Sequence, residues 1–323
     1  MTSPAHAFWV VSPGRGELRA ETLSDPAAEE VQVRTRFSGV SRGTEALVFQ
    51  GFVPPSQHQA MRAPFQAGDF PGPVKYGYAS VGEVERGPDE LRGQTVFCLH
   101  PHQDRYVVPA AAVRPLPDAL PAERAVLAAN AETALNVVWD AGIAPGDRVC
   151  VIGAGVVGCL VAWLAGGIPG TRVTLVDLEP TRASIAQTLG VLFAEPDAAP
   201  ADQDVVVHTS ASDNGLATAL ACAGMEARVV EASWFGDHRP AVPLGEAFHA
   251  RRLELRSSQV GQLPAGRRAR WSHRRRLALA LDLLVEPRLD CLISGESRFT
   301  DLPALMPQLA KAGGDVLCHR IVY

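Results

Sequence analysis

Three glycines and one aspartate form the clearest chemical pattern in the chain. Gly153, Gly155 and Gly158 give G-x-G-x-x-G directly after the apolar run 149–152, and Asp177 follows a second apolar run, 19 residues after Gly158. In a strand–turn–helix unit the first glycine permits the tight turn, the second lets the backbone approach a pyrophosphate, and the third lets helix and strand pack closely. A carboxylate in that place accepts hydrogen bonds from ribose hydroxyls and repels a 2′-phosphate. The pattern predicts a dinucleotide site that prefers NAD to NADP.

The helix expected from Val156 adds the positive end of a helix dipole to this site. Its first residues, Val156 and Val157, carry backbone N–H groups without partners inside the helix, and such groups bind phosphate. Arg182, five residues after Asp177, is expected to flank the adenine. NAD is therefore the expected cofactor.

Two kinds of periodicity divide the chain. Residues 1 to about 115 contain short β-rich runs between Gly and Pro residues, which is typical of a small β barrel-like domain. Later, helical and strand patterns alternate as in a doubly wound parallel sheet. The segment 51–73, with five prolines, is expected to be a loop. The expected fold class is α/β, with a β-rich part over 1–128, a NAD-binding part over 129–258 and a segment, 259–323, that returns to the first part.

Composition narrows the class of protein. With 323 residues, 47% of them hydrophobic and 20% charged, the chain describes a globular protein large enough for two domains. The formal net charge of −5 counts against general nucleic-acid binding, and no apolar run reaches membrane-spanning length. The six cysteines contain no C-x-x-C pair, so thiols are expected rather than disulfides. We expect a cytoplasmic protein that acts on a small-molecule substrate, with no nucleic-acid and no membrane partner.

Together these features resemble the medium-chain dehydrogenase/reductase superfamily, the relatives of zinc alcohol dehydrogenases. The resemblance implies a GroES-like β-rich domain with a Rossmann domain, an oxidoreductase and a homodimer. It also implies that Arg42 contacts the cofactor pyrophosphate and that the helix containing Thr133 approaches the nicotinamide. The carrying stretches are SGVSRGTE (38–45), GYASVGEV (77–84), GQTVF (93–97), AETAL (131–135), VIGAGVVG (151–158) and VDLEPTR (176–182).

Departures from the zinc-binding members concern the metal. Ser41 stands at the position of a ligand cysteine, and Tyr78 and Ala79 stand where those members carry His-Glu. The third ligand position falls near Ala129 or Asn130, and the loop of four cysteines that binds structural zinc is missing. Zinc sites use thiolate, imidazole or carboxylate ligands, so we expect no metal and a zinc-less branch.

Two motifs are similar to the branch that contains bacteriochlorophyllide a dehydrogenase, which uses NAD to oxidise a hydroxyethyl group. These motifs are G-V-S-x-G-T-E and G-Y-x-S-V-G. Ala79 departs from the glutamate that follows the tyrosine in that branch, so the tetrapyrrole substrate is not carried over.

Hydride transfer without zinc needs another group to handle the proton. Tyr78 is the first candidate, with Lys75 expected to lower its pKa, although Tyr78 can also simply fill the space of the metal. His100 is the second candidate, as a proton relay or as a wall of the pocket. Ser41 or Thr44 is expected to pass the proton onward.

Three further groups of residues have alternative interpretations. Strand alternation would place Cys98, His100 and His102 on one face, as a metal site or with His102 in a solvated loop. Glu45 belongs either to the loop that meets substrate and cofactor or to a structural ion pair, and Glu132 either approaches the nicotinamide or, as we favour, forms a salt bridge. The arginine-rich segment 267–276 is expected to be a solvated helix face, or a site for an anion.

The favoured function is zinc-independent, NAD(H)-dependent hydride transfer between a secondary alcohol and a ketone of a biosynthetic metabolite. Two alternatives stay open. One is an NAD(P)H-dependent ene or quinone reductase, and the other is a non-catalytic NAD(H)-binding sensor or scaffold.

Overall fold

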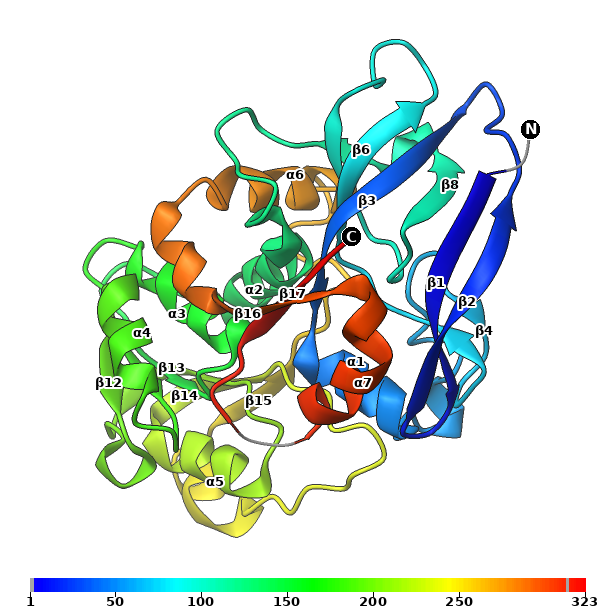
Figure 1. Ribbon diagram of the computed structural model, residues 1–323. Helices are drawn as coiled ribbons and strands as arrows, with labels where there is room; N and C mark the ends of the chain where they lie inside the picture. The colour runs from blue at the N-terminus through cyan, green and yellow to red at the C-terminus, as the bar shows by residue number, and fades with distance from the viewer. Residues whose placement is uncertain (1–2, 312–313) are drawn as a thin grey trace. The chain divides into compact units, whose positions relative to one another are not determined.

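The computed structural model describes residues 3–311 and 314–323, which form two compact units (Figure 1). Unit 1 comprises Met1–Ala129, Leu281–Glu286 and Ile293–Tyr323, and unit 2 comprises Asn130–Ala280 and Pro287–Leu292. Unit 1 is rich in β-structure and unit 2 is a Rossmann-type α/β unit, as the sequence predicts. Residues 259–280 lie in unit 2, whereas the return segment was expected from residue 259.

Unit 1 is built on two sheets. A four-stranded sheet has the order β2–β1–β5–β4, and a seven-stranded sheet has the order β16–β17–β3–β6–β7–β9 with β8 also paired to β3. The C-terminal strand β17 pairs antiparallel with β3, so the end of the chain completes the β-rich unit. The strands are β1 (Ser3–Ser12), β2 (Arg15–Leu23), β3 (Glu30–Val40), β4 (Ala67–Gly68), β5 (Val74–Lys75), β6 (Ser80–Arg86), β7 (Thr95–Cys98), β8 (Arg105–Pro109), β9 (Arg114–Pro115), β16 (Ile293–Arg298) and β17 (Cys318–Val322).

Unit 2 contains a parallel sheet of six strands in the order β12–β11–β10–β13–β14–β15. The order reverses between β10 and β13, which makes this the topological switch point of a doubly wound sheet. Helices α3 and α4 pack on each other and on β10 to β12, and α5 packs on β10, β13 and β14. The strands are β10 (Arg148–Ile152), β11 (Arg172–Val176), β12 (Leu192–Ala194), β13 (Gln203–His208), β14 (Ala223–Glu231) and β15 (Glu254–Ser257).

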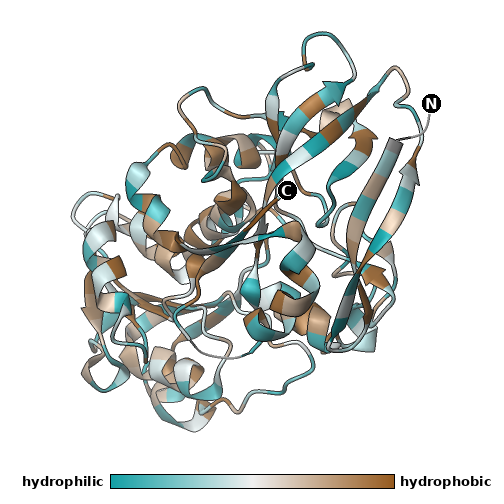
Figure 2. Ribbon diagram, viewed as in Figure 1, coloured by the Kyte–Doolittle hydropathy of each residue, from teal (hydrophilic) through white to brown (hydrophobic). Residues whose placement is uncertain are grey.

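Burial explains the strands of unit 2. Val149 to Ile152 are all buried, as is the run 173–176 in β11, because helices cover both faces of a parallel sheet. Figure 2 shows the hydrophobic colour concentrated on these central strands and on α2. The helices of the chain are α1 (Arg42–Gln50), α2 (Ala128–Ala141), α3 (Val156–Gly166), α4 (Arg182–Leu189), α5 (Asp213–Cys222), α6 (His273–Leu283) and α7 (Leu302–Leu309).

Two elements differ from the expectation. Residues 42–50 form α1, although this part of the chain was expected to be almost free of helix. The helix ends at Gly51, whose φ of 77° suits glycine and closes the last turn. Residues 287–292, in the segment expected to return to the first part, form a 3₁₀ helix that belongs to unit 2, and strand β16 begins at Ile293.

All six cysteines are free thiols, and five of them are buried, as expected. Within the described residues, no helix has both the length and the apolar character that crossing a membrane requires.

Candidate active site

Each glycine of the glycine turn in unit 2 has a different structural role. Gly153 adopts φ +105°, which disfavours any residue with a side chain. A Cβ at Gly158 would lie 1.9 Å from the carbonyl oxygen of Gly153, so only glycine lets α3 pack this closely on the turn. Gly155 precedes α3 with ordinary φ, and nothing lies within 4 Å of a Cβ built there. The backbone is therefore open to a ligand at Gly155.

Asp177 follows β11 and faces this turn. Its Oδ2 accepts a hydrogen bond from the Ala154 N–H at 2.6 Å, and its Oδ1 accepts one from the Glu179 N–H at 2.9 Å. A carboxylate beside a glycine turn and the start of α3 matches the arrangement that binds the adenosine ribose in dinucleotide sites. Val156 and Val157 form the first turn of α3 beside it.

The other residues expected to bind the cofactor are Arg182, Arg42 and Thr133. Arg182 begins α4 and is only 7% exposed. In unit 1, the Arg42 guanidinium donates to the main-chain carbonyls of Leu309 at 3.1 Å and Lys311 at 2.9 Å, and also to that of Val316. Arg42 thus joins α1 to the segment after α7. Thr133 lies in α2.

Tyr78, Ser41 and Thr44 come together in unit 1, where the sequence resemblance places the zinc ligands. The Tyr78 phenol is within hydrogen-bonding reach of the Ser41 and Thr44 side chains. Burial and the nearby Glu45 carboxylate raise the pKa of Tyr78 to about 12, and the two hydroxyls offset only part of this rise. The phenol is therefore neutral near pH 7 and can donate a hydrogen bond.

The expected role of Lys75 is wrong. Its Nζ donates to the Glu21 carboxylate at 2.8 and 3.0 Å and to Gln103 Oε1 at 2.8 Å. Burial of Lys75, at 8% exposed, requires such a partner, and Glu21 supplies it. The pKa of Tyr78 accordingly rises, whereas a neighbouring ammonium would lower it.

His102 is buried, so the expectation of a solvated loop is also wrong. Its Nε2 lies 2.8 Å from Glu45 Oε2, and its Nδ1 lies 2.7 Å from Ser38 Oγ. Ser38 Oγ in turn lies 2.9 Å from the Tyr323 hydroxyl. The other oxygen of Glu45 accepts the Ser41 N–H at 2.8 Å. Glu45 thus has His102 as a buried hydrogen-bond partner, and it joins the Tyr78 cluster to this buried network.

Within the part of the chain that the structure describes, no carboxylate forms a hydrogen bond or an ion pair with His100. Its ring stacks on Tyr106, with centroids 3.7 Å apart, and its Nδ1 lies 3.0 Å from the Pro101 carbonyl oxygen. Burial lowers the pKa of His100 to about 3, so the ring is neutral near pH 7 and is a weak base. The structure therefore supports a pocket wall better than a proton relay.

The residues present do not fit a catalytic zinc. Ser41 and Tyr78 offer hydroxyls, and Ala79 offers no ligand atom. Strand β7 ends at Cys98, and His102 is committed to Glu45 and Ser38. Across residues 3–311 and 314–323, no group of three or more His, Cys, Asp or Glu side chains is arranged to hold a metal ion.

Glu132 forms the expected salt bridge, and its partner comes from the arginine-rich segment. Arg276 Nε lies 3.1 Å from Glu132 Oε1, and Arg276 is only 2% exposed. Burial raises the pKa of Glu132, and Arg276 partly offsets the rise. In the same segment Arg275 lies 4.0 Å over the Trp271 ring and Arg267 lies 5.1 Å over Trp139. The interpretation as a solvated face holds for Arg268, Arg270, Arg274 and Arg275, which are exposed, but not for the buried Arg276.

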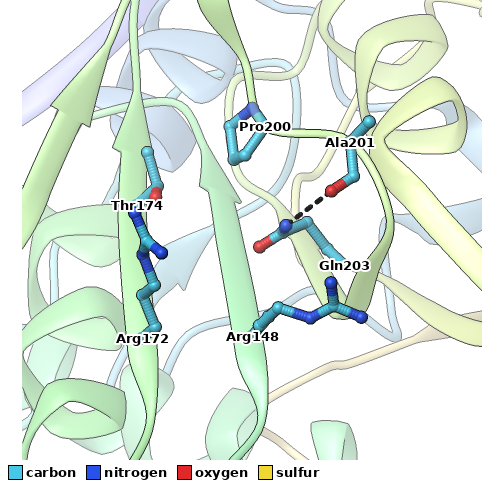
Figure 3. Close-up of a pocket in the computed structure, with 6 residues that line it drawn as sticks. All are labelled: Arg148, Arg172, Thr174, Pro200, Ala201 and Gln203. Carbon is cyan, nitrogen blue, oxygen red and sulfur yellow. Dashed lines mark hydrogen bonds between the residues drawn. The ribbon is translucent and has the colours of Figure 1, made fainter.

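A pocket of about 230 Å³ lies at the amino ends of β10 and β11, the edge of the sheet opposite the glycine turn (Figure 3). Arg148 and Arg172 line it, but Arg148 is paired with Asp202 at 3.0 Å and Asp204 at 3.5 Å. The residues that line this pocket include none of those predicted to bind the cofactor or to handle the proton.

Local sequence spacing does not predict a second histidine network, in unit 2. His208 Nδ1 lies 2.6 Å from Glu231 Oε2, and His208 Nε2 lies 2.7 Å from Ser210 Oγ. The residues stand at the ends of neighbouring strands, β13 and β14. The sequence feature that could have pointed to this network is His208 followed by Ser210 at the end of a predicted strand, beside the switch point of the sheet.

Comparison with known proteins supports the fold. No family model matches the chain. D-guloside 3-dehydrogenase of Escherichia coli is 26% identical over 296 residues, covering 82% of this chain and 83% of that protein. L-idonate 5-dehydrogenase of Escherichia coli has a similar structure, with a TM-score of 0.81 and 17% identity, over 100% of this chain and 99% of that one.

Two further solved structures carry a cofactor. A protein of Sinorhizobium meliloti classed as a zinc-binding dehydrogenase, with bound NADP, gives a TM-score of 0.79 at 18% identity over 99% of this chain and all of that one. A short chain alcohol dehydrogenase of Escherichia coli complexed with NADH gives 0.77 at 16% identity, with the same coverage. The chain thus has the fold of these dehydrogenases, and the relative found by sequence is itself a dehydrogenase.

Proposed function

We propose that the chain is a zinc-independent dehydrogenase that transfers hydride between NAD(H) and a secondary alcohol/ketone pair. The observation that carries this proposal is the glycine turn with Asp177 held against the Ala154 N–H. The relatives are named for oxidising sugar derivatives and polyols, so a hydroxylated metabolite of that kind is the proposed substrate. Bound NAD would supply the hydride acceptor.

Asp177 is the basis for choosing NAD over NADP. A carboxylate after the second strand of a dinucleotide fold accepts ribose hydroxyls, and a 2′-phosphate beside Asp177 would suffer charge repulsion. The neighbouring structures hold either cofactor, so this preference rests on Asp177 alone.

Tyr78 is the proposed proton-handling residue. Since the pKa of Tyr78 is raised to about 12, its neutral phenol can give its proton to the substrate oxygen in ketone reduction, and in alcohol oxidation the same oxygen, as phenolate, would take the alcohol proton. Ser41 and Thr44 extend this hydroxyl cluster, and the Ser41 N–H connects it to Glu45. The hydroxyls stand in place of the Lewis acid of the zinc-binding members.

A homodimer is proposed from the exposed edge of the parallel sheet. Strand β15 is the terminal strand of that sheet, and all four of its residues are exposed, including Leu255 at 39%. An uncovered strand edge offers backbone groups that a second copy can pair with. Light scattering should give twice the mass of the 34.4 kDa chain, and a monomer would contradict this assignment.

Gly155→Ala tests the nucleotide site without disturbing the fold. The new methyl group meets no atom of the protein, but it occupies the space through which a pyrophosphate approaches the backbone. We expect at least a tenfold loss of NADH affinity with an unchanged unfolding midpoint. Gly266→Ala is the matched control, because a Cβ there also meets nothing within 4 Å. Unchanged NADH affinity in Gly155→Ala would reject the assignment.

Activity after metal removal tests the mechanism. Protein treated with a chelator should oxidise a panel of sugar alcohols and secondary alcohols with NAD at the same rate as untreated protein. Loss of turnover that zinc restores would contradict zinc independence.

A further inference from the structure

The pocket at the amino ends of the unit 2 strands is a site that the proposed chemistry does not use. It has a volume of about 230 Å³, and its walls are the first residues of three strands and the loop before β13 (Figure 3). Strands β10 and β11 each run five residues from this pocket to the edge that carries Gly153 and Asp177. Five residues span about 16 Å, so a molecule in the pocket lies too far from the glycine turn to react there. The lining residues are Arg148, Arg172, Thr174, Pro200, Ala201 and Gln203.

Arg172 gives the pocket an uncompensated positive charge. Its side chain is exposed, and among the described residues no carboxylate or carbonyl pairs with it. Arg148 stands directly opposite Arg172 in the ladder, but Asp202 at 3.0 Å and Asp204 at 3.5 Å neutralise its charge. A guanidinium presents its N–H donors as a fork that matches a carboxylate on both oxygens. Arg172 is therefore available to bind an anion.

Thr174 and Gln203 each bring an oxygen without a partner to the wall of the pocket. Thr174 is only 7% exposed and Gln203 only 5%. Within residues 3–311 and 314–323, neither Thr174 Oγ1 nor Gln203 Oε1 forms a hydrogen bond. Gln203 Nε2 donates to the Ala201 carbonyl oxygen at 2.8 Å, which holds the amide with Oε1 turned away from Ala201 (Figure 3). Buried polar groups are normally paired, so these two oxygens are suited to a polar ligand.

The size and polarity of the pocket define a class of ligand. A protein cavity of about 150 Å³ holds benzene, so this pocket has room for about six to ten heavy atoms. One free guanidinium matches one negative charge, and the neighbouring Asp202 and Asp204 disfavour a phosphate monoester, whose charge near pH 7 is about −2. A carboxylate therefore suits Arg172 better. Because Gln203 Oε1 only accepts hydrogen bonds, the ligand must also carry a donor such as a hydroxyl.

We propose that this pocket binds a small hydroxycarboxylate of about three or four carbon atoms. Arg172 binds the carboxylate, Thr174 donates a further hydrogen bond to it, and Gln203 Oε1 accepts a ligand hydroxyl. Pro200 and Ala201 face the carbon chain. No bond of the ligand is made or broken at this site, and its occupancy does not depend on the proposed hydride transfer.

Isothermal titration with related small molecules tests the class of ligand. Glycerate has both the carboxylate and the hydroxyls, propionate lacks the hydroxyls, and glycerol lacks the carboxylate. Wild-type protein should bind glycerate with a Kd below about 1 mM and propionate about threefold to tenfold more weakly, and it should not bind glycerol measurably. Glycerol phosphate represents the other common anion and should bind more weakly than glycerate.

Two substitutions assign the binding to this pocket. Arg172→Gln removes the charge of an exposed side chain, so glycerate should bind at least tenfold more weakly while NADH affinity and the unfolding midpoint stay unchanged. Thr174→Val keeps the shape and removes the hydroxyl, and a loss of about threefold to tenfold is expected. The matched controls are Arg239→Gln, at an exposed arginine of unit 2 outside the pocket, and Thr188→Val, at an exposed threonine of α4.

Each outcome decides the proposal. Glycerate binding that both pocket variants weaken and both controls leave unchanged supports it. Wild-type protein that does not bind glycerate, or Arg172→Gln with wild-type affinity for glycerate, overturns it. Glycerol phosphate binding that is tighter than glycerate binding and is lost in Arg172→Gln overturns the choice of a carboxylate. Protein that shows the expected glycerate binding but no dehydrogenase activity overturns the function proposed above and supports this site.

Discussion

The two units each contain a carboxylate, an imidazole and a serine hydroxyl in one hydrogen-bonded row. In unit 1 the row is Glu45, His102 and Ser38, with distances of 2.8 and 2.7 Å. In unit 2 it is Glu231, His208 and Ser210, with distances of 2.6 and 2.7 Å. The functional groups match, although Glu45 bonds Nε2 of its histidine and Glu231 bonds Nδ1.

The rows differ in where they end. Ser38 is 1% exposed, and its hydroxyl continues to Tyr323, whose ring stacks on Phe299. Ser210 is exposed and stands beside the glycine turn, and its hydroxyl continues to Ser212 Oγ at 2.9 Å. The same functional groups are therefore buried in unit 1 and lie at the surface in unit 2. Exposure to solvent, rather than residue type, separates the two rows.

The largest expected difference between the rows is in stability. Glu45→Ala removes a carboxylate that is 5% exposed, so His102 Nε2 and the Ser41 N–H each lose the oxygen that they contact in the buried interior. We expect a loss of about 3–5 kcal/mol in the free energy of unfolding. Glu231→Ala leaves a site that water can reach, so about 1–2 kcal/mol is expected there. Urea denaturation of both variants measures the gap, and equal losses would remove the distinction.

Turnover gives the second difference. Tyr78→Phe removes the hydroxyl proposed to face the substrate, and a loss of about a hundredfold in kcat is expected with unchanged NADH affinity. Ser38→Ala changes only the buried row and should alter kcat by less than about threefold. Because the pKa of Tyr78 is about 12, ketone reduction should show no fall from phenol ionisation below about pH 10. A kcat for Tyr78→Phe equal to that of wild type would exclude Tyr78 from the chemistry.

His100 sharpens the comparison, because it is a buried imidazole with no carboxylate partner. Its folded pKa is about 3, against 6.5 for the ordinary side chain. Below pH 6.5 the unfolded chain binds a proton that the folded chain does not, so this group lowers stability as the pH falls from 7 toward 4.

His100→Phe keeps the stacking on Tyr106 and removes the titration. Between pH 7 and 4.5 the variant should lose about 2 kcal/mol less stability than wild type. Unfolding free energies at the two pH values test this, and identical losses would show that His100 is protonated in the folded protein.

The sequence predicts the fold well where local spacing determines structure. The glycine turn, the strand before it and the helix after it follow from the spacing of Gly153, Gly155 and Gly158. The return of the C-terminal end of the chain to the β-rich part and the ion pair of Glu132 were also predicted correctly. Each of these follows either from residues near one another in the chain or from the rule that a buried charge needs a partner.

The two histidine networks could not be predicted from local sequence patterns. Glu45 and His102 are 57 positions apart, and Ser38 and Tyr323 are 285 positions apart. Such pairs depend on strand register and on the return of β17, which hydrophobic periodicity does not report. Lys75 shows the same limit. It lies three positions from Tyr78 in the sequence, yet its ion-pair partner is Glu21, 54 positions away.

The most direct test of the central claim is the affinity of metal-free protein for NADH and NADPH, with elemental analysis of the untreated sample. The account predicts NADH binding at least tenfold tighter than NADPH binding, because Asp177 repels the 2′-phosphate, and it predicts no dependence on zinc. Preference for NADPH, or NADH binding that appears only when zinc is restored, would contradict it.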